Sequence, residues 1–232
     1  MSKDLRDLNY EVINQDSVFV SNFYEIELEG IKLHKLDSMT SLHQIKVSKL
    51  CLEMGKKMGL SPQELKTLVK AANIYDIGKM AVSQELQSLP RKLTPKEFDE
   101  MKQHVTRGVA LLEAYNKTKT SKEDHIPDEV IKLVGEHHER LDGSGYPKGL
   151  SGKQINLQSR ILAVADMLGA LTAKRYQREA MSLKDAFAIL DNDVKNGKLD
   201  ATVVKTAKEI CQEREQLKQG KVKDSRSKNI TR

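Results

Sequence analysis

The sequence is poor in aromatic residues, with no tryptophan, four phenylalanines and six tyrosines among its 232 residues. A hydrophobic core must therefore be built mainly from Leu, Ile, Val, Ala and Met, as helical proteins often build it. Hydrophobic residues make up 38% of the chain and charged residues 31%, which fits a well-solvated surface. The length allows one large domain, or one domain with extensions.

Cysteine is also scarce, and long apolar runs are absent. Cys51 and Cys211 both lie in helical patterns without a CxxC spacing, so we expect two buried thiols in a reducing cytosol. No apolar run approaches the roughly 20 residues needed to span a membrane. The first residues, beginning Met1-Ser2-Lys3, lack the apolar stretch of a signal peptide. We therefore expect a cytoplasmic protein with no membrane partner.

The net charge of +6 is concentrated at the C-terminal end. Residues 212–232 hold seven Lys or Arg and three Asp or Glu, a net of +4, so the remainder carries only +2. A basic end of this kind is typical of a disordered, solvated tail. Because no nucleic-acid-reading motif accompanies the charge, we expect no nucleic-acid partner.

Beyond the first 36 residues the apolar positions recur with the period of an α-helix. Two capping boxes mark helix starts, one pairing Ser61 with Glu64 and the other pairing Thr94 with Glu97. A cluster of turn-forming residues follows residue 141 and ends another helical pattern. The predicted helices cover residues 40–58, 63–75, 94–115, 127–140, 158–172, 183–190 and 202–217.

The first 36 residues follow a different pattern. Between Tyr24 and Leu33 apolar and charged residues alternate, which indicates one or two short strands around Gly30. Such a strand offers an edge through which two chains could pair as a homodimer. The sequence thus predicts an all-α bundle over residues 37–211, with a short N-terminal extension over 1–36 that carries the strands and a tail over 212–232.

Two aspartates are the first sign of chemistry. A lone histidine on a helix is ordinarily a satisfied surface or core residue, but Asp76 and Asp166 are set in apolar runs. Burying an unpaired carboxylate there costs on the order of several kcal/mol. Lys79 follows Asp76 by three residues, so a structural ion pair accounts for Asp76 alone. Asp166 has no charged neighbour at i±3 or i±4 and needs a partner from elsewhere in the fold.

Four of the six histidines join these aspartates as candidate metal ligands. Imidazole and carboxylate groups together favour Fe, Mn, Ni, Co or Zn over Ca or Mg. The adjacent His137 and His138 would point about 100° apart on a helix, so they flank one site from neighbouring directions. Two cations roughly 3.5–4 Å apart, bridged by a carboxylate, can clamp a phosphate for in-line attack. The sequence therefore predicts a divalent metal centre of one or two ions.

The segment His137 to Pro147, HHERLDGSGYP, resembles the HHE-x-x-DG-x-GYP signature of the HD-GYP phosphodiesterases. Further segments resemble that family's motifs in the same order: Asp37–His43 its first-helix histidine, Asp76–Lys79 the second half of HDIGK, Lys102–Gly108 its H-xxx-G helix, and Arg160–Asp166 its RI-x-x-VAD helix. The match extends over about residues 37–199. It implies an HD-superfamily helical bundle that hydrolyses cyclic-di-GMP to linear pGpG and on to GMP.

The resemblance also assigns roles to single residues. The metal ligands would be His43, Asp76, His104, His137, His138 and Asp166, with Asp76 as the bridge and a catalytic residue. Lys79 would neutralise the scissile phosphate, Arg175 and Arg178 would hold the dinucleotide, and Tyr146 would line the mouth within the Gly143–Pro147 turn. Cations around a dianionic substrate fit this assignment. The implied metal is Fe or Mn, with Ni, Co or Zn as alternatives.

Several positions depart from the family pattern. The His-Asp pair of the family name is Tyr75-Asp76 here, and a phenol with a pKa near ~10 replaces imidazole poorly. This weakens or empties the ion position built from His43, Tyr75, Asp76 and Asp166, with tyrosinate ligation of ferric iron as the minor alternative. The set Asp76, His104, His137 and His138 stays complete. Gly169 replaces a usual Asp, Met39 replaces a carboxylate that some members carry, and the loop around Arg175 is altered.

Three functions follow from these departures and stay open. The first is a phosphodiesterase for cyclic-di-GMP whose activity is weakened by the loss of the histidine. The second is a degenerate member that binds a cyclic dinucleotide or a signalling partner without hydrolysis. A third is activity on another cyclic dinucleotide or phosphoester. The resemblance also implies diguanylate cyclase domains as partners.

Overall fold

The computed structural model describes residues 33–36, 38–174 and 179–229, and for residues 38 and 218–229 it describes the backbone alone. The elements are α2 (Ser38–Lys57), α3 (Pro62–Ile74), η2 (Ile77–Ala81), α4 (Gln84–Ser88), α5 (Pro95–Lys117), η3 (Lys122–Asp124), α6 (Asp128–Glu136), η4 (Gly152–Gln154), α7 (Leu157–Thr172), α8 (Leu183–Lys195) and α9 (Ala201–Asn229). These ranges contain no β-strand, and one isolated bridge joins Asp142 to Ser151. The predicted all-α fold is confirmed.

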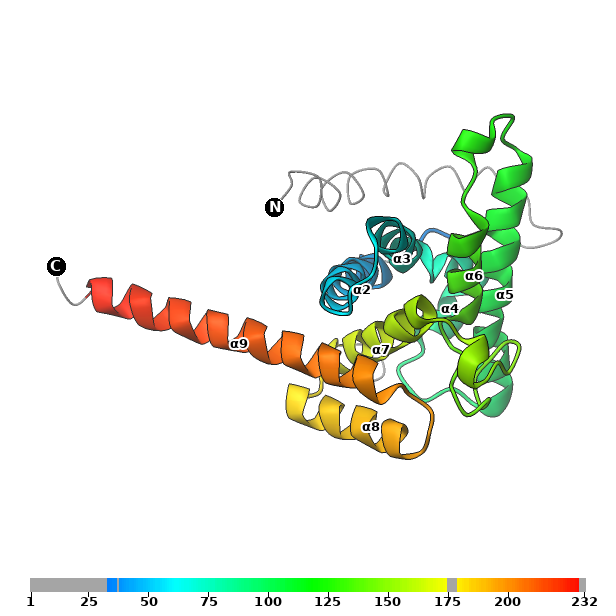
Figure 1. Ribbon diagram of the computed structural model, residues 1–232. Helices are drawn as coiled ribbons and strands as arrows, with labels where there is room; N and C mark the ends of the chain where they lie inside the picture. The colour runs from blue at the N-terminus through cyan, green and yellow to red at the C-terminus, as the bar shows by residue number, and fades with distance from the viewer. Residues whose placement is uncertain (1–32, 37, 175–178, 230–232) are drawn as a thin grey trace.

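The helices form a bundle with one long projecting arm (Figure 1). Helix α2 packs against α3 and α7, while α5 packs against α6 and the short turn η2. Helices α8 and α9 pack on each other and on α7, and α9 also contacts α2. Beyond these contacts α9 runs outward toward the C-terminal end (Figure 1). Helices α5 and α7 and the turns beside η2 and after α6 carry most of the candidate ligands, and these segments meet inside the bundle.

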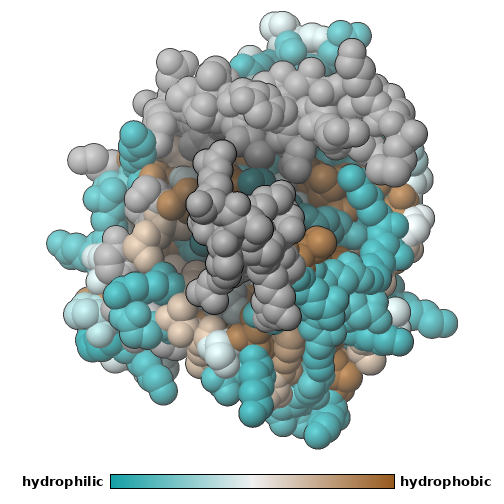
Figure 2. Space-filling view, turned by 90° about the vertical axis from the view of Figure 1, so that its left-hand side faces the viewer, coloured by the Kyte–Doolittle hydropathy of each residue, from teal (hydrophilic) through white to brown (hydrophobic). Residues whose placement is uncertain are grey.

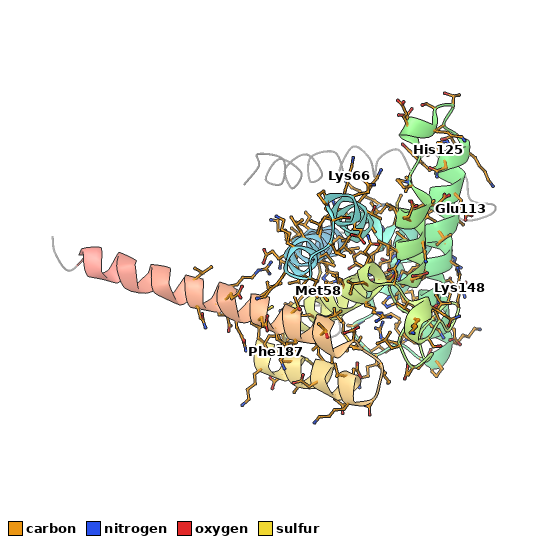
Figure 3. The ribbon with its side chains drawn as sticks, in the orientation of Figure 1. Met58, Lys66, Glu113, His125, Lys148 and Phe187 are labelled. Carbon is orange, nitrogen blue, oxygen red and sulfur yellow. The ribbon has the colours of Figure 1, made fainter. Side chains whose placement is uncertain are left out.

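The core has the composition that the scarcity of aromatics predicted. Its largest fully buried side chains are mostly aliphatic, such as Leu68, Leu111 and Ile161, and Tyr75 is the aromatic exception. Side chains crowd the space between the helices (Figure 3). Both cysteines are free and buried, as expected. Polar side chains frame the face of the molecule that Figure 2 shows.

Both predicted capping boxes are present. The Ser61 amide donates to Glu64 Oε2 at 2.8 Å and the Glu64 amide donates to Ser61 Oγ at 3.3 Å. Thr94 and Glu97 form the same reciprocal pair with the same two distances. Each box satisfies amides that a helix start leaves without partners, which fixes where α3 and α5 begin.

Three boundaries differ from the prediction. Helix α6 ends at Glu136 rather than near residue 140, because the chain turns there and the Leu141 amide donates to the Lys198 carbonyl at 3.0 Å. Helix α8 continues to Lys195. Helix α9 is helical as far as Asn229, whereas the sequence predicted disorder from residue 212; its Lys, Glu and Gln residues are good helix formers. The predicted strands around Gly30 lie outside the described residues.

The described helices also bear on membrane crossing. None of them combines the length and the apolar character that crossing a bilayer requires.

Candidate metal centre and its pocket

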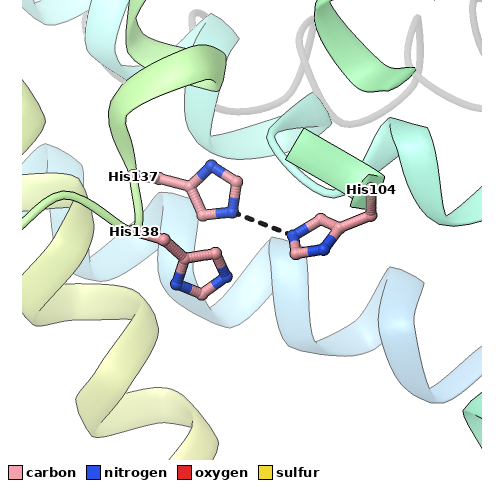
Figure 4. A group of neighbouring side chains, drawn as sticks. All are labelled: His104, His137 and His138. Carbon is pink, nitrogen blue, oxygen red and sulfur yellow. Dashed lines mark hydrogen bonds between the residues drawn. The ribbon is translucent and has the colours of Figure 1, made fainter. Parts of the chain in front are cut away.

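Three of the predicted ligands meet at one point inside the bundle. His104 lies on α5, and His137 and His138 lie in the turn that follows α6. One ring nitrogen from each residue lies within 4.8 Å of the other two. Figure 4 shows the three rings converging from these two elements. The predicted shared helix for His137 and His138 was wrong, because α6 has already ended, yet both rings still reach the same site.

A close backbone contact brings η2 to this cluster. A Cβ atom added at Gly78 would overlap the carbonyl oxygen of His104 and the backbone nitrogen of Gly108. Only glycine allows η2 to lie this close to α5. The contact sets Asp76 and Lys79, on either side of Gly78, against the helix that carries His104.

The hydrogen bonds of two histidines fix their tautomers. His104 Nδ1 lies 2.6 Å from the Met101 carbonyl, and His137 Nδ1 lies 2.7 Å from the Val134 carbonyl. Because a carbonyl oxygen only accepts, each Nδ1 must carry the hydrogen, and each neutral ring then has a lone pair on Nε2. The two Nε2 atoms face each other at 3.3 Å, the contact drawn in Figure 4. Two lone pairs at that distance repel each other, and a shared cation would relieve this repulsion.

At neutral pH these rings do not take up a proton that could serve as that cation. Burial lowers the pKa of His104 to about 4, and burial also lowers the pKa of His137. The pKa of His138 falls as well, through burial and then through the neighbouring imidazoles of His137 and His104. All three rings are therefore neutral at that pH. Metal-binding histidines commonly donate their second ring nitrogen to a carbonyl in this way.

Asp76 places a carboxylate beside the three histidines. Its Oδ2 accepts from Lys79 Nζ at 2.7 Å, and its Oδ1 lies 3.4 Å from His104 Nε2. Burial alone would raise the pKa of Asp76, but the charge of Lys79 holds it below its usual range. Asp76 lies in the turn between α3 and η2, not inside a helix. Three neutral imidazoles and one carboxylate fit a divalent transition-metal ion.

The remaining predicted ligands form a separate group. Asp166 on α7 accepts from the Tyr75 hydroxyl at 2.8 Å, and His43 Nε2 lies 2.9 Å from the same Oδ1 atom. Burial would raise the pKa of Asp166, but the hydrogen bond and charge of His43 lower it. Asp166 thus has the distant partners that the sequence required. Two protein groups, the Tyr75 hydroxyl and His43 Nε2, already contact its Oδ1 atom.

Tyr75 is fully buried between the two groups. Its ring makes edge contacts with His43, at 6.4 Å between centroids, and with His137, at 4.9 Å. Gly169, one turn after Asp166 on α7, leaves the space that His43 uses. A Cβ atom there would lie 2.9 Å from His43 Cε1. The departures at Tyr75 and Gly169 therefore act on one and the same group, the pairing of His43 with Asp166.

The loop after the histidines is fixed by a buried glutamate. Glu139 accepts from the amides of Lys148 at 2.7 Å and Leu150 at 2.9 Å. Tyr146 lies in the loop between Glu139 and Lys148 and is joined to Pro147 by a cis peptide bond. Its ring stacks on His138 with 4.6 Å between ring centroids. Burial and then the charges of Asp166 and Asp76 raise the pKa of Tyr146, so its hydroxyl keeps its proton.

A pocket of about 570 Å³ opens above the centre. Its lining includes the predicted residues Lys79 and Tyr146 and the additional cations Arg91, Lys92, Arg140 and Lys174. Arg140 is half-buried, and its guanidinium donates to the backbone carbonyl of Glu139 at 2.9 Å. The predicted contacts Arg175 and Arg178 lie outside the described residues. A positively charged pocket above a metal centre suits a phosphate ester.

Sequence reasoning missed three contributors. Glu139 and Arg140 stand inside the quoted HHERLDGSGYP segment, and an acidic residue directly after two candidate ligands was an available signal. Phe98, which also lines the pocket, stands on α5 one and a half turns before His104. Residues six apart on a helix do not share a face, so no pattern in the sequence singles out Phe98.

Comparison with known proteins places these features in a family. The family described as "HD domain" matches residues 27–203. The chain is 37% identical over 164 residues to the 3'3'-cGAMP-specific phosphodiesterase 1 of Vibrio cholerae serotype O1, covering 71% of this chain and 36% of that protein. It is 40% identical over 135 residues to a probable cyclic di-GMP phosphodiesterase of the same organism, covering 56% and 30%. The chain thus spans about a third of the length of these relatives.

Among solved structures, an HDG"Y"P protein from Bdellovibrio bacteriovorus superposes with a TM-score of 0.60. The sequence identity is 22%, and the alignment covers 74% of this chain and 52% of that one. At this level of identity the match shows a shared fold.

Proposed function

The chain belongs to the HD domain family, and on that premise we propose that its pocket is the active site of a metal-dependent phosphodiesterase for cyclic dinucleotides. The observation that carries the proposal is the pair of Nε2 lone pairs of His104 and His137, 3.3 Å apart beneath a cationic pocket. The proposed first substrate is cyclic-di-GMP, opened to pGpG and then to GMP. Relatives named for cyclic di-GMP and for 3'3'-cGAMP support the substrate class.

The ion would be held by Asp76, His104, His137 and His138. Bound there, it would supply Lewis-acid polarisation of a phosphodiester. Lys79 binds Asp76 and also lines the pocket, so its ammonium can stand beside a phosphate while it keeps Asp76 ionised. Arg140 adds a second half-buried cation to the lining of the pocket. Arg175 and Arg178 remain predicted contacts to the dinucleotide.

The donor set favours Fe or Mn, with Ni, Co or Zn as alternatives. We propose one ion in each chain rather than two. A second ion would need Asp166 and His43, but Asp166 Oδ1 already accepts from Tyr75 and contacts His43. Tyr75 contributes a protonated hydroxyl where imidazole would offer a lone pair. Of the proposed partners, diguanylate cyclase domains rest on the family resemblance alone, and a second copy of the chain rests on the strand predicted between Tyr24 and Leu33.

Metal content and turnover test the function together. The full chain is loaded with Fe(II), Mn or Zn, and bound metal is counted by elemental analysis. Cyclic-di-GMP and 3'3'-cGAMP are then supplied in parallel. The products measured are linear pGpG, the linear dinucleotide formed from 3'3'-cGAMP, and mononucleotides. We expect about one ion in each chain and cleavage of at least one of the two. A chain that takes up no metal, or a loaded chain that binds a dinucleotide and never cleaves it, contradicts the enzyme and supports a receptor.

Two substitutions at one position test the ion number. Tyr75→His supplies a ring nitrogen and removes the hydroxyl bonded to Asp166, so we expect metal content to rise toward two ions and turnover to rise with it. Tyr75→Phe is the matched control, since it removes the hydroxyl without adding a ligand, and should stay at one ion. Two ions in the unaltered chain would refute the single-ion proposal and leave the hydrolase intact.

A further inference from the structure

Phe98 is an exposed aromatic residue at the mouth of the pocket. It lies in the first turn of α5, just after the Thr94 cap, and its side chain is 48% exposed. The other large hydrophobic residues that are comparably exposed in the described part of the chain, Leu42 and Leu217, do not line the pocket. A solvent-facing phenyl ring contributes little to folding, so its position at the pocket suggests contact with a ligand.

A row of aromatic contacts connects Phe98 to His138 in the candidate metal centre. Phe98 meets Tyr146 edge-on, with 6.3 Å between centroids and 83° between planes. Tyr146 in turn stacks on His138 with 29° between planes. Glu139 holds the loop that carries Tyr146 through two backbone amides. The ring of Phe98 therefore has a fixed neighbour rather than standing alone on the surface.

A cation accompanies the two outer rings. Lys102 Nζ lies 5.3 Å from the centroid of Phe98 and 5.9 Å from that of Tyr146. It also pairs with Asp99 at 2.6 Å, which holds it in place. Aromatic faces with a basic residue beside them are the arrangement that proteins use to stack nucleobases while tracking a phosphate backbone.

The spacing along α5 sets the size of the ligand. Phe98 precedes His104 by six residues, or about 9 Å along the helix axis. A bare phosphate held at the metal centre does not extend that far, whereas the base of a nucleotide does. The pocket offers aromatic contact at one end and metal ligands at the other, with Lys79, Arg140 and other cations along its lining.

We propose that Phe98 is a stacking platform for one nucleobase of the ligand whose phosphate lies at the metal centre. The assignment rests on the proposed cyclic-dinucleotide function and deepens it, because it names the residue that distinguishes a nucleotide from a simple phosphate ester. Phe98 is a binding residue and takes no part in the bond cleavage.

The test compares two ligands and three variants of the full, metal-loaded chain. Dissociation constants for cyclic-di-GMP and for inorganic phosphate are measured by calorimetry. Phe98→Ala should weaken cyclic-di-GMP binding by roughly tenfold to a hundredfold, the range seen for loss of a base-stacking ring, and should leave phosphate binding unchanged. Phe98→Trp should retain the affinity. Metal content and melting temperature of each variant show that it is folded and loaded.

Phe187→Ala is the matched control. Phe187 lies on α8, labelled in Figure 3, and has its own lysine, Lys208, 5.6 Å from the ring centroid. It does not line the pocket, so its loss should leave both dissociation constants unchanged.

Each result bears on a different part of the argument. Unchanged cyclic-di-GMP binding in Phe98→Ala, or an equal loss of phosphate binding, overturns the platform and leaves the proposed hydrolase standing. Tight binding that depends on Phe98 without any cleavage overturns the hydrolase and keeps the platform. An unaltered chain that binds phosphate but no cyclic-di-GMP overturns the platform as stated here.

Discussion

The two halves of the centre use the same kinds of residue and reach opposite states. The half formed by α5 and the turn after α6 is called the open half. In it, His104 and His137 donate their Nδ1 hydrogens to carbonyls and present two lone pairs to each other. In the half formed by α2 and α7, His43 and Tyr75 both direct their polar atoms to Asp166 Oδ1. The first half presents ring nitrogens without hydrogens, and in the second half protein groups pair with the carboxylate of Asp166.

The difference shows that ligand identity alone does not define a metal site. A buried carboxylate must be satisfied, and a hydroxyl or a protonated ring can satisfy it as well as a metal can. Whether a residue can bind a metal depends on which protein atom it already contacts. His104 and His137 donate to the backbone carbonyls of Met101 and Val134. Because these partners are backbone atoms, they cannot be recognised from the amino-acid sequence.

Two glycines offer the largest test of this comparison. Gly78→Ala places a methyl group against the backbone of α5, which cannot move away cheaply, so we expect the unfolding free energy to fall by about 3 kcal/mol or more and metal binding to be lost. Gly169→Ala meets only the ring of His43 and the side chain of Val47, and it gains helix propensity. We expect that variant to stay within about 1 kcal/mol of the parent and to keep its metal. Thermal unfolding measures the stability of both variants, and elemental analysis measures their metal content. Equal losses of stability and metal in the two variants would contradict the difference between the two halves.

Removing one histidine from each half gives the next largest effect. His137→Ala removes a lone pair from the open half, so we expect metal affinity to fall by more than about 100-fold, beyond the loss typical of residues that only orient a ligand. His43→Ala should change metal affinity by less than about tenfold, because His43 serves Asp166. Competition with a chelator of known affinity measures both. Equal losses at the two positions would mean that His43 is a ligand after all.

The metal-free protein should lose stability in mild acid. The pKa of His104 is about 4 in the folded chain and 6.5 ordinarily, so between these values the unfolded chain binds a proton that the folded chain does not. Stability is therefore complete above pH 6.5 and falls as the pH approaches 4, by on the order of 3 kcal/mol from His104. The lowered pKa values of Asp76 and Asp166 act only below their ordinary value of 3.8.

Denaturant unfolding in the presence of a chelator, repeated at steps from pH 7 to 4, measures this slope. The variant His104→Gln, which cannot take up the proton, should show a shallower fall. A stability that stays constant over this range in the parent chain would refute the neutral, buried state assigned to the open half.

Much of the architecture could be predicted because its causes are local. The capping boxes at Ser61 and Thr94 fixed two helix starts, and the apolar period located most helices. The family resemblance is confirmed by the comparisons, and three of the predicted ligands, His104, His137 and His138, lie together inside the bundle. The missing partner of Asp166, required by electrostatics alone, was found in His43 and Tyr75.

The rest depended on contacts between segments distant in the sequence. Nothing local announces that Leu141 will bond to Lys198 and end α6 early, or that Gly78 will touch α5. The hydroxyl of Tyr75 was treated as a poor ligand, whereas its structural role is that of a donor to Asp166. That role depends on a contact across 91 residues and is therefore invisible to periodicity.

Two buried glutamates that flank the histidine pair give the smallest and most selective test. Glu139 accepts from two backbone amides, those of Lys148 and Leu150, whereas Glu136 accepts from the Ser159 hydroxyl at 2.6 Å. Glu139→Gln keeps one acceptor oxygen and sets an NH₂ group against the other amide, so we expect a loss of about 1–3 kcal/mol. Glu136→Gln can still accept from Ser159 and should cost less than about 1 kcal/mol.

The two variants should also differ in the site. Releasing Lys148 and Leu150 frees the loop that stacks Tyr146 on His138, so Glu139→Gln should weaken cyclic-di-GMP binding while metal content stays near that of the parent. Glu136→Gln should leave both unchanged. If Glu139→Gln instead loses the metal and Glu136→Gln does not, the loop supports the histidines directly. The open half would then extend from the ligands into the Tyr146 loop, and the boundary between ion binding and nucleotide binding would have to move with it.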